Sequence, residues 1–355
     1  EGESKPPCDM AGIGDPAPLA VEVVRDWRLV PGEPPTRQKA INITACTWWP
    51  GREIRLPVVL VAPVEGGPFP FVISSIGLSA TQIRPDSLEQ ALLPRGVAFV
   101  HVGIGQIDQM EPAGVLADEM NALFLKTKDV RYTPPWFWGL TYMRAVTAAL
   151  TEPAVFKPGK VGATGGSKRG LASAAAAAWD DRVTVIVPMV APVYSEPQYN
   201  PRFPELDEEY LQLAEQGRTE LAVDEVARLR AIRANKDRYW LGDDDFLAAG
   251  WTRDDVKDSE RRLGELHLAL YNAPRYDRRG VDYFFQMGTN DNITPRLPEF
   301  FRRFPRFSGY VVPGGQHGTD GVGNQRRTPT LPEVKANTLA VCSNQFFGDR
   351  PRLRT

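Results

Sequence analysis

The sequence predicts an α/β fold with a mostly parallel central sheet, flanking helices and a helical cap insertion. Short apolar runs rich in β-branched residues alternate with helical segments in the first half of the chain, which is typical of strands buried on both faces. The alternation stops near residue 194, where a polar helical stretch begins, and it resumes at residue 281. We therefore assign residues 1–193 and 281–355 to the core and residues 194–280 to a cap over the strand ends.

The composition argues against several classes of protein. Of 355 residues, 42% are hydrophobic and 24% are charged, and the formal net charge is -2. A nucleic-acid-binding protein would normally be strongly basic, and no apolar run approaches the ~20 residues of a membrane-spanning helix. Cys8, Cys46 and Cys342 allow at most one disulfide and no CxxC metal site. We expect no nucleic-acid partner, no membrane span, no metal and no cofactor.

Strands dominate the first part of the chain. Alternating or apolar runs predict strands at residues 21–24, 40–45, 52–62, 69–75 and 96–102. We interpret the first three as an antiparallel edge that leads into the central sheet. A short helix is expected at residues 87–93 and a longer one at residues 136–150.

The centre of the chain contains a predicted strand, followed by a glycine turn, a serine and a helix of mostly small residues. Residues 160–166 are typical of a buried strand, Ser167 comes next, and the alanine-rich run 171–179 favours a helix. This succession is the nucleophile elbow of α/β-hydrolases, whose sharp turn exposes the serine hydroxyl. The motif departs from G-x-S-x-G, because Arg169 stands where the second glycine is expected and Gly170 follows it. Glycine-rich turns of this kind also bind phosphate or simply reverse the chain.

Two further polar residues each follow a predicted strand. Asp291 lies in a turn after residues 281–287, and His317 lies in a glycine-rich loop after residues 309–312. The order Ser167, Asp291, His317 is the order of nucleophile, acid and base in α/β-hydrolases. We predict that His317 accepts the proton of Ser167 and that Asp291 orients the imidazole. A plain turn aspartate is the alternative for Asp291.

Catalysis by such a serine requires two donors to the developing oxyanion. We predict that one is the backbone N–H of Lys168, which directly follows Ser167. The loop after residues 69–75 would supply the other, through the N–H of Leu78 or, failing that, of Gly77. The loss of one donor of this kind typically costs ~3 kcal/mol of transition-state stabilisation.

Other residues near these segments have competing interpretations. Gly77, Trp136 and Trp138 are candidate substrate-binding residues, and the alternative for the two tryptophans is packing at a helix start. We expect His101 to be a hydrogen-bonded core histidine, because it lies inside an apolar strand, and we expect His267 to lie on a cap helix. For Arg169 we favour a carboxylate partner under the elbow over a role in attracting an acidic substrate.

The elbow and the acid turn resemble those of the PhoPQ-activated pathogenicity-related proteins. The resemblance is carried by residues 165–170, 181–183, 186–190 and 288–291, and it covers roughly residues 133–318. That family consists of exported bacterial α/β-hydrolase-like proteins with a serine in an S-K-R-G turn. The resemblance implies an α/β-hydrolase fold, the Ser167–Asp291–His317 assignment and a secreted or periplasmic location. Glucuronoyl esterases carry a distantly similar serine turn, which leaves carbohydrate esters open as substrates.

These observations predict a serine hydrolase that cleaves a carboxylic ester through an acyl-enzyme intermediate. The substrate would be a small-molecule or polymer-derived ester. An amidase or peptidase with the same triad and a non-catalytic binding protein on the same fold are the alternatives, and the intact triad argues against the last. The sequence leaves the natural substrate and the oligomeric state open.

Overall fold

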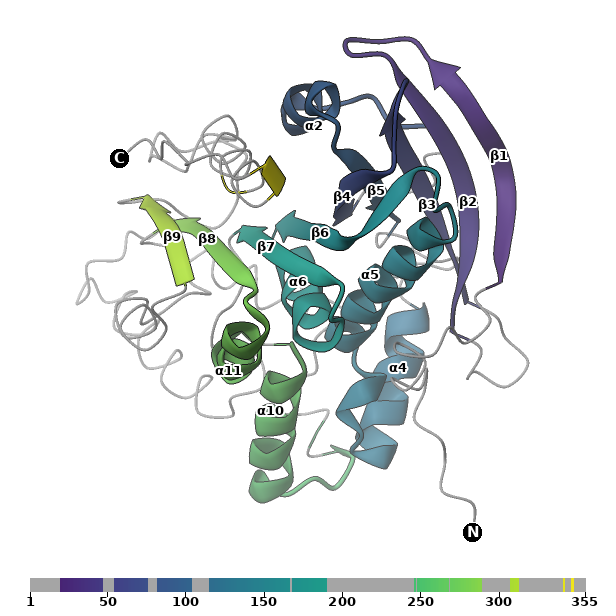
Figure 1. Ribbon diagram of the computed structural model, residues 1–355. Coiled ribbons are helices and arrows are strands. Elements are labelled where there is room, and N and C mark those ends of the chain that lie inside the picture. Colours follow the sequence, from purple (N-terminus) through teal and green to yellow (C-terminus); the bar gives the residue numbers. More distant parts are fainter. Residues whose placement is uncertain are drawn as a thin grey trace, which may run out of the picture.

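The computed structural model describes residues 20–46, 54–75, 82–103, 115–166, 168–189, 246, 248–267, 269–288, 307–312, 341 and 346–347. Within these ranges, one sheet of nine strands forms the centre of the molecule, in the order β1-β2-β3-β5-β4-β6-β7-β8-β9 (Figure 1). The strands are β1 (Val21–Val30), β2 (Thr36–Cys46), β3 (Ile54–Pro63), β4 (Phe69–Ser75), β5 (Ala98–Val102), β6 (Phe156–Gly166), β7 (Val183–Met189), β8 (Asp282–Gly288) and β9 (Phe307–Val312).

Strand direction divides the sheet into two parts. The β1, β2, β3 and β5 strands pair antiparallel to one another in that order. From β5 to β9 every adjacent pair is parallel. The predicted α/β class, with a mostly parallel sheet and an antiparallel edge, is therefore confirmed.

Helices cover both faces of the sheet. The helices are α2 (Ser87–Leu92), α4 (Val115–Thr127), α5 (Pro134–Leu150), α6 (Lys168–Trp179), α10 (Arg253–His267) and α11 (Ala269–Arg279), with short 3-10 turns η1 (Leu93–Arg95) and η2 (Val130–Tyr132). In Figure 1, α2 lies on one side of the sheet, and α5 and α6 lie on the other. None of the described helices combines the length and the apolar character needed to cross a membrane.

The alternation of side chains along each strand produces two hydrophobic cores. On β4, Phe71 and Ile73 face the larger core, which is shared with α4, α5, α6, α10 and α11. Val72 between them faces the smaller core, which contains Leu88 and Leu92 of α2. Because successive strand residues point to opposite faces, each face of the sheet has its own helical cover.

The described part of the predicted cap packs beside the core helices. Residues 194–245 lie outside the described residues, but α10 and α11 fall within the predicted range of 194–280. Both helices contribute side chains to the larger core, and Tyr276 of α11 donates from its hydroxyl to Ala174 O of α6 at 2.8 Å. Trp179 Nε1 at the end of α6 donates to Leu266 O of α10 at 2.8 Å. The α10 and α11 helices therefore belong to the helical layer on that face of the sheet.

Candidate active site

The strands that precede the four predicted site loops end at the same edge of the parallel part of the sheet. These loops follow β4, β6, β8 and β9, and all four strands run in the same direction. Adjacent strands lie ~4.8 Å apart, so the ends of β8 and β9 are ~10 and ~14 Å from the end of β6. The three residues from Gly288 to Asp291 and the five from Val312 to His317 can span ~10 and ~16 Å when extended. Both loops are long enough to reach the position above β6.

Several predicted site residues themselves fall outside the described residues. These are Ser167, Asp291, His317, Leu78 and Gly77. Their roles stay predictions, and the structure contributes the strands and helices from which they extend. Lys168 is described as the first residue of α6. Its N–H is one of the first backbone donors of the helix, which have no partner within a helix and are free to bind an anion.

The turn between β6 and α6 is as short as a nucleophile elbow requires. The strand ends at Gly166 and the helix begins at Lys168, so only position 167 separates them. A Cβ on Gly165 would lie 2.5 Å from the backbone oxygen of Arg169, whereas a Cβ on Gly166 would meet nothing within 4 Å. The first turn of α6 therefore folds directly back onto Gly165, and this close approach excludes any side chain there.

The same contact accounts for the departure from G-x-S-x-G. The Cβ of Arg169 would lie 2.9 Å from a Cβ on Gly165. Since Gly165 has no side chain, there is room for the side chain of Arg169 where the start of α6 contacts the end of β6. Among the described residues, no carboxylate pairs with Arg169, so the favoured carboxylate partner is not found there. Burial raises the pKa of the nearby Tyr142 hydroxyl, and the positive charge of Arg169 partly lowers it.

Small residues also let α6 approach its neighbour α5 closely. A Cβ on Gly139 of α5 would lie 2.5 Å from the Cβ of Ala175 of α6. The alanines of α6 are buried, and Ser173 is fully buried with its hydroxyl donating to Gly170 O at 2.7 Å. The alanine-rich composition of α6 thus follows from the tight packing behind the elbow.

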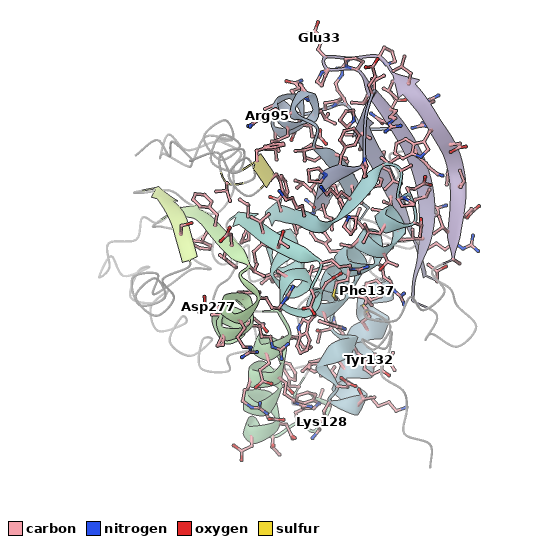
Figure 2. All side chains as sticks on the ribbon, in the orientation of Figure 1. Glu33, Arg95, Lys128, Tyr132, Phe137 and Asp277 are labelled. Atoms are coloured by element: carbon pink, nitrogen blue, oxygen red, sulfur yellow. The ribbon has the colours of Figure 1, made fainter. Side chains whose placement is uncertain are left out.

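Trp136 and Trp138 lie in the core beneath this region. Their side chains are 1% and 0% exposed, and both belong to the larger hydrophobic core. The Trp136 ring stands edge-on against that of Trp179, with a centroid distance of 6.2 Å. Phe137 between them is equally buried and is labelled on α5 in Figure 2. These contacts support the packing alternative for both tryptophans.

His101 is a hydrogen-bonded core histidine, as predicted. It is 5% exposed on β5, and its Nδ1 lies 3.1 Å from Ser74 Oγ of β4. Its Nε2 pairs with the carboxylate of Glu89 on α2. The other carboxylate oxygen of Glu89 accepts from the N–H of Asp86 at 2.7 Å, which completes the capping box at the start of α2. The side chain of His267 lies outside the described set.

No cluster of three or more His, Cys, Asp or Glu side chains suited to a metal ion occurs among the described residues. The described polar side chains beneath this edge include the hydroxyls of Ser74 and Tyr142, the imidazole of His101 and the carboxylate of Glu89.

Comparison with known proteins links this architecture to one fold. The profile of the family described as PhoPQ-activated pathogenicity-related protein matches residues 140–199, from α5 through β7. An acetyl xylan esterase from Paenibacillus sp. R4 superposes with a TM-score of 0.57 at 14% identity, over 95% of this chain and 92% of the esterase. The chain has an α/β-hydrolase fold.

Two further solved structures are similar to the chain. A glucuronoyl esterase from Solibacter usitatus superposes with a TM-score of 0.53 at 13% identity, over 93% of this chain and 87% of the esterase. A puromycin-hydrolyzing peptidase from Mycobacterium tuberculosis superposes with a TM-score of 0.51 at 16% identity, over 89% of this chain but 40% of the peptidase. No curated protein sequence matches the chain. The resemblance to the PhoPQ-related family is thus confirmed over residues 140–199, and the distant similarity to glucuronoyl esterases is confirmed as a likeness of fold.

Proposed function

We propose that this protein is a serine hydrolase that cleaves carboxylic esters through an acyl-enzyme intermediate. Ser167 is the nucleophile, His317 the general base and Asp291 the acid that orients the imidazole. The backbone N–H groups of Lys168 and Leu78 bind the oxyanion, with Gly77 as the alternative to Leu78.

The observation that carries this proposal is the single-residue turn at position 167. A serine there stands between the end of β6 and the start of α6, where Gly165 and Arg169 cross too closely for a second side chain. A sharp strand-to-helix turn of this kind exposes the serine hydroxyl above the sheet edge. The loops that carry Asp291 and His317 leave the same edge and are long enough to reach it.

The reaction proceeds in two half-reactions on these groups. Ser167 Oγ attacks the ester carbonyl carbon while His317 takes its proton, and the N–H groups of Lys168 and Leu78 hold the resulting oxyanion. Collapse of this tetrahedral species breaks the ester bond, and His317 passes its proton to the departing alcohol. A water molecule then attacks the acyl-enzyme as His317 accepts a proton from it. The second collapse breaks the bond to Ser167 Oγ, which takes the proton back from His317, and the carboxylic acid is released.

Carbohydrate esters are the substrate class to test first. Two of the esterases that superpose over most of their own length are described as an acetyl xylan esterase and a glucuronoyl esterase. An exported bacterial enzyme would encounter such polymer-derived esters outside the cytoplasm. A peptide substrate would place a greater demand on His317, because an amine is a poorer leaving group than an alcohol.

The proposal is tested by the rates at which the protein hydrolyses four substrates. These are p-nitrophenyl acetate, an acetylated xylo-oligosaccharide, a methyl glucuronate ester and a peptide anilide. We expect the wild-type protein to cleave esters faster than the anilide. Ser167→Ala and His317→Ala should each lower kcat by at least about 1000-fold. Ser308→Ala, which removes an exposed hydroxyl on β9, should leave kcat unchanged. Retention of ester hydrolysis in Ser167→Ala would contradict the proposal, and preferential cleavage of the anilide would favour the peptidase alternative.

A further inference from the structure

Tyr142 of α5 is a buried polar side chain that the proposed triad does not use. It is 0% exposed and lies within the larger hydrophobic core. Its hydroxyl donates to Thr164 O of β6 at 2.8 Å. Burial raises the pKa of this hydroxyl, and hydrogen bonding by the side chain of Ser75, the last residue of β4, partly lowers it. A single oxygen atom therefore connects the ends of two strands.

These two strands are the ones that lead into the nucleophile and the predicted oxyanion loop. Thr164 is the third residue before Ser167, and Ser75 is the third residue before Leu78. The parallel ladder between β4 and β6 ends at the pair Ile73 and Ala163. Tyr142 therefore joins β4 to β6 just beyond their last ladder pair, where the two strands continue toward the site.

The hydroxyl of Tyr142 stays a donor throughout the working pH range. Burial raises the pKa of the Tyr142 hydroxyl far above its usual value, and the Ser75 hydroxyl and the Arg169 charge only partly oppose this effect. The carbonyl of Thr164 is an acceptor and the Ser75 hydroxyl a donor, so the phenolic oxygen can satisfy both at once. Buried hydrogen bonds of this kind admit few alternative arrangements, because a lost partner leaves a polar group unsatisfied.

The opposite face of the same strand end is also fixed. Ser74 points away from Tyr142, and its Oγ lies 3.1 Å from His101 Nδ1. His101 in turn pairs with Glu89 of α2, whose carboxylate caps the helix start. The end of β4 is thus held by polar contacts on both faces of the sheet, which limits rotation of the strand about its own axis.

We propose that Tyr142 is a positioning residue, which fixes the ends of β4 and β6, from which the loop after β4 and the Ser167 turn extend. This inference rests on the proposed function, because its catalytic consequence requires a nucleophile on one strand and an oxyanion donor on the other. A misplacement of ~1 Å in such a pair costs about 100-fold in rate. The loss of the Tyr142 hydroxyl should therefore reduce turnover, with little effect on substrate binding.

Two phenylalanine variants separate positioning from general stability. Tyr142→Phe removes the shared oxygen. Tyr276→Phe is its matched control, because Tyr276 is 1% exposed and its hydroxyl also donates to a backbone carbonyl, Ala174 O, at 2.8 Å. We expect similar decreases in Tm for the two variants. With p-nitrophenyl acetate, kcat should fall about 10- to 100-fold in Tyr142→Phe, with KM within about twofold of wild type, and should be nearly unchanged in Tyr276→Phe.

Hydrogen exchange measures the same positioning without substrate. We expect the backbone amides of Ile73–Ser75 and Thr164–Lys168 to exchange faster in Tyr142→Phe than in wild type, and to be unaffected in Tyr276→Phe. Should Tyr142→Phe fail to fold, Ser75→Ala removes one of the two hydrogen bonds and should show the same changes at smaller size.

The outcomes distinguish this inference from the proposed function. If the wild-type protein hydrolyses esters and Tyr142→Phe and Tyr276→Phe lose kcat equally, Tyr142 has no positioning role. If the wild-type protein hydrolyses no ester, the proposed function fails, and hydrogen exchange alone decides whether Tyr142 positions the two strand ends. Unchanged exchange at both strand ends in Tyr142→Phe overturns the inference in either case.

Discussion

The antiparallel strands β1–β3 and the strand ends of β4 and β6 are held in place by different means. In the antiparallel part, long ladders carry exposed ion pairs, such as Arg55 Nη1 to Glu22 Oε2 at 2.6 Å, with the two side chains 52% and 55% exposed. At the strand ends, Tyr142 makes a buried hydrogen bond to Thr164 O, and His101 makes a partly buried one to Ser74.

The two kinds of contact restrict the positions of the strands to different degrees. An exposed ion pair can rearrange in water with little change in free energy. A buried hydroxyl or carboxylate keeps its hydrogen-bond partners in only one arrangement. Two backbone segments in direct contact cannot move closer without a steric clash. The region with this second kind of contact surrounds the edge from which the proposed catalytic loops emerge. Substitutions that disturb it should have large effects, and those in the antiparallel part should have small ones.

The largest effect is expected for Gly165→Ala. The new Cβ would lie 2.5 Å from the backbone oxygen of Arg169, so the start of α6 must shift. We expect esterase activity to fall at least about 100-fold and the free energy of unfolding to decrease by about 3 kcal/mol. Gly166→Ala is the control, since its Cβ would meet nothing within 4 Å. Steady-state kinetics and urea unfolding of both variants check this, and equal behaviour of the two would show that the crossing at Gly165 is not tight.

Removal of His101 is expected to have the next largest effect. His101→Phe leaves the carboxylate of Glu89 buried without its partner, and uncompensated buried charges of this kind cost about 3 kcal/mol. The double variant His101→Phe/Glu89→Gln keeps an acceptor for the start of α2 and removes the charge. It should recover at least half of the lost free energy of unfolding in urea denaturation, and a double variant no more stable than the single one would contradict the pairing.

A smaller effect is expected where α5 meets α6. Gly139→Ala would place a methyl group 2.5 Å from the Cβ of Ala175, and overpacking of this kind costs about 2 kcal/mol. Ala175→Gly in the same chain removes the opposing methyl group. The double variant should therefore be more stable than Gly139→Ala alone, as measured by thermal unfolding. Additive losses in the double variant would mean that the two positions do not touch.

The smallest effect is expected in the antiparallel part. Glu22→Gln removes the charge that faces Arg55 on the exposed edge of the sheet. We expect a change of less than about 1 kcal/mol in the free energy of unfolding, which diminishes further at high salt. Urea denaturation at low and high salt measures it. A loss as large as that of His101→Phe would remove the contrast between the two regions.

Local patterns in the sequence predicted the strands and the junction of β6 and α6 well. The strand at 69–75 matches β4, and the glycines before Ser167 and the alanines after it predicted the junction of β6 and α6. The α4 helix was not predicted, although Met120 and Phe124 are buried one helical turn apart. That spacing was a usable signal.

The contacts that fix the strand ends could not be predicted in the same way. Tyr142 and Thr164 are 22 residues apart in the chain, and a tyrosine in an apolar helix has the same local pattern whether or not its hydroxyl finds a partner. In the sequence, the close contact between Gly165 and Arg169 left only one trace: Arg169 stands where the G-x-S-x-G motif has its second glycine. Such contacts depend on how separate elements pack, and no periodicity of a single segment encodes them.

The proposed function requires the residue between β6 and α6 to be a nucleophile. Reaction of the intact protein with a fluorophosphonate, followed by peptide mass spectrometry, tests it most directly. We expect one adduct, on Ser167, formed quickly in the wild-type protein and at least about 100-fold more slowly in His317→Ala. An adduct on another residue, or no adduct in a folded protein, would contradict the assignment of Ser167 as the nucleophile.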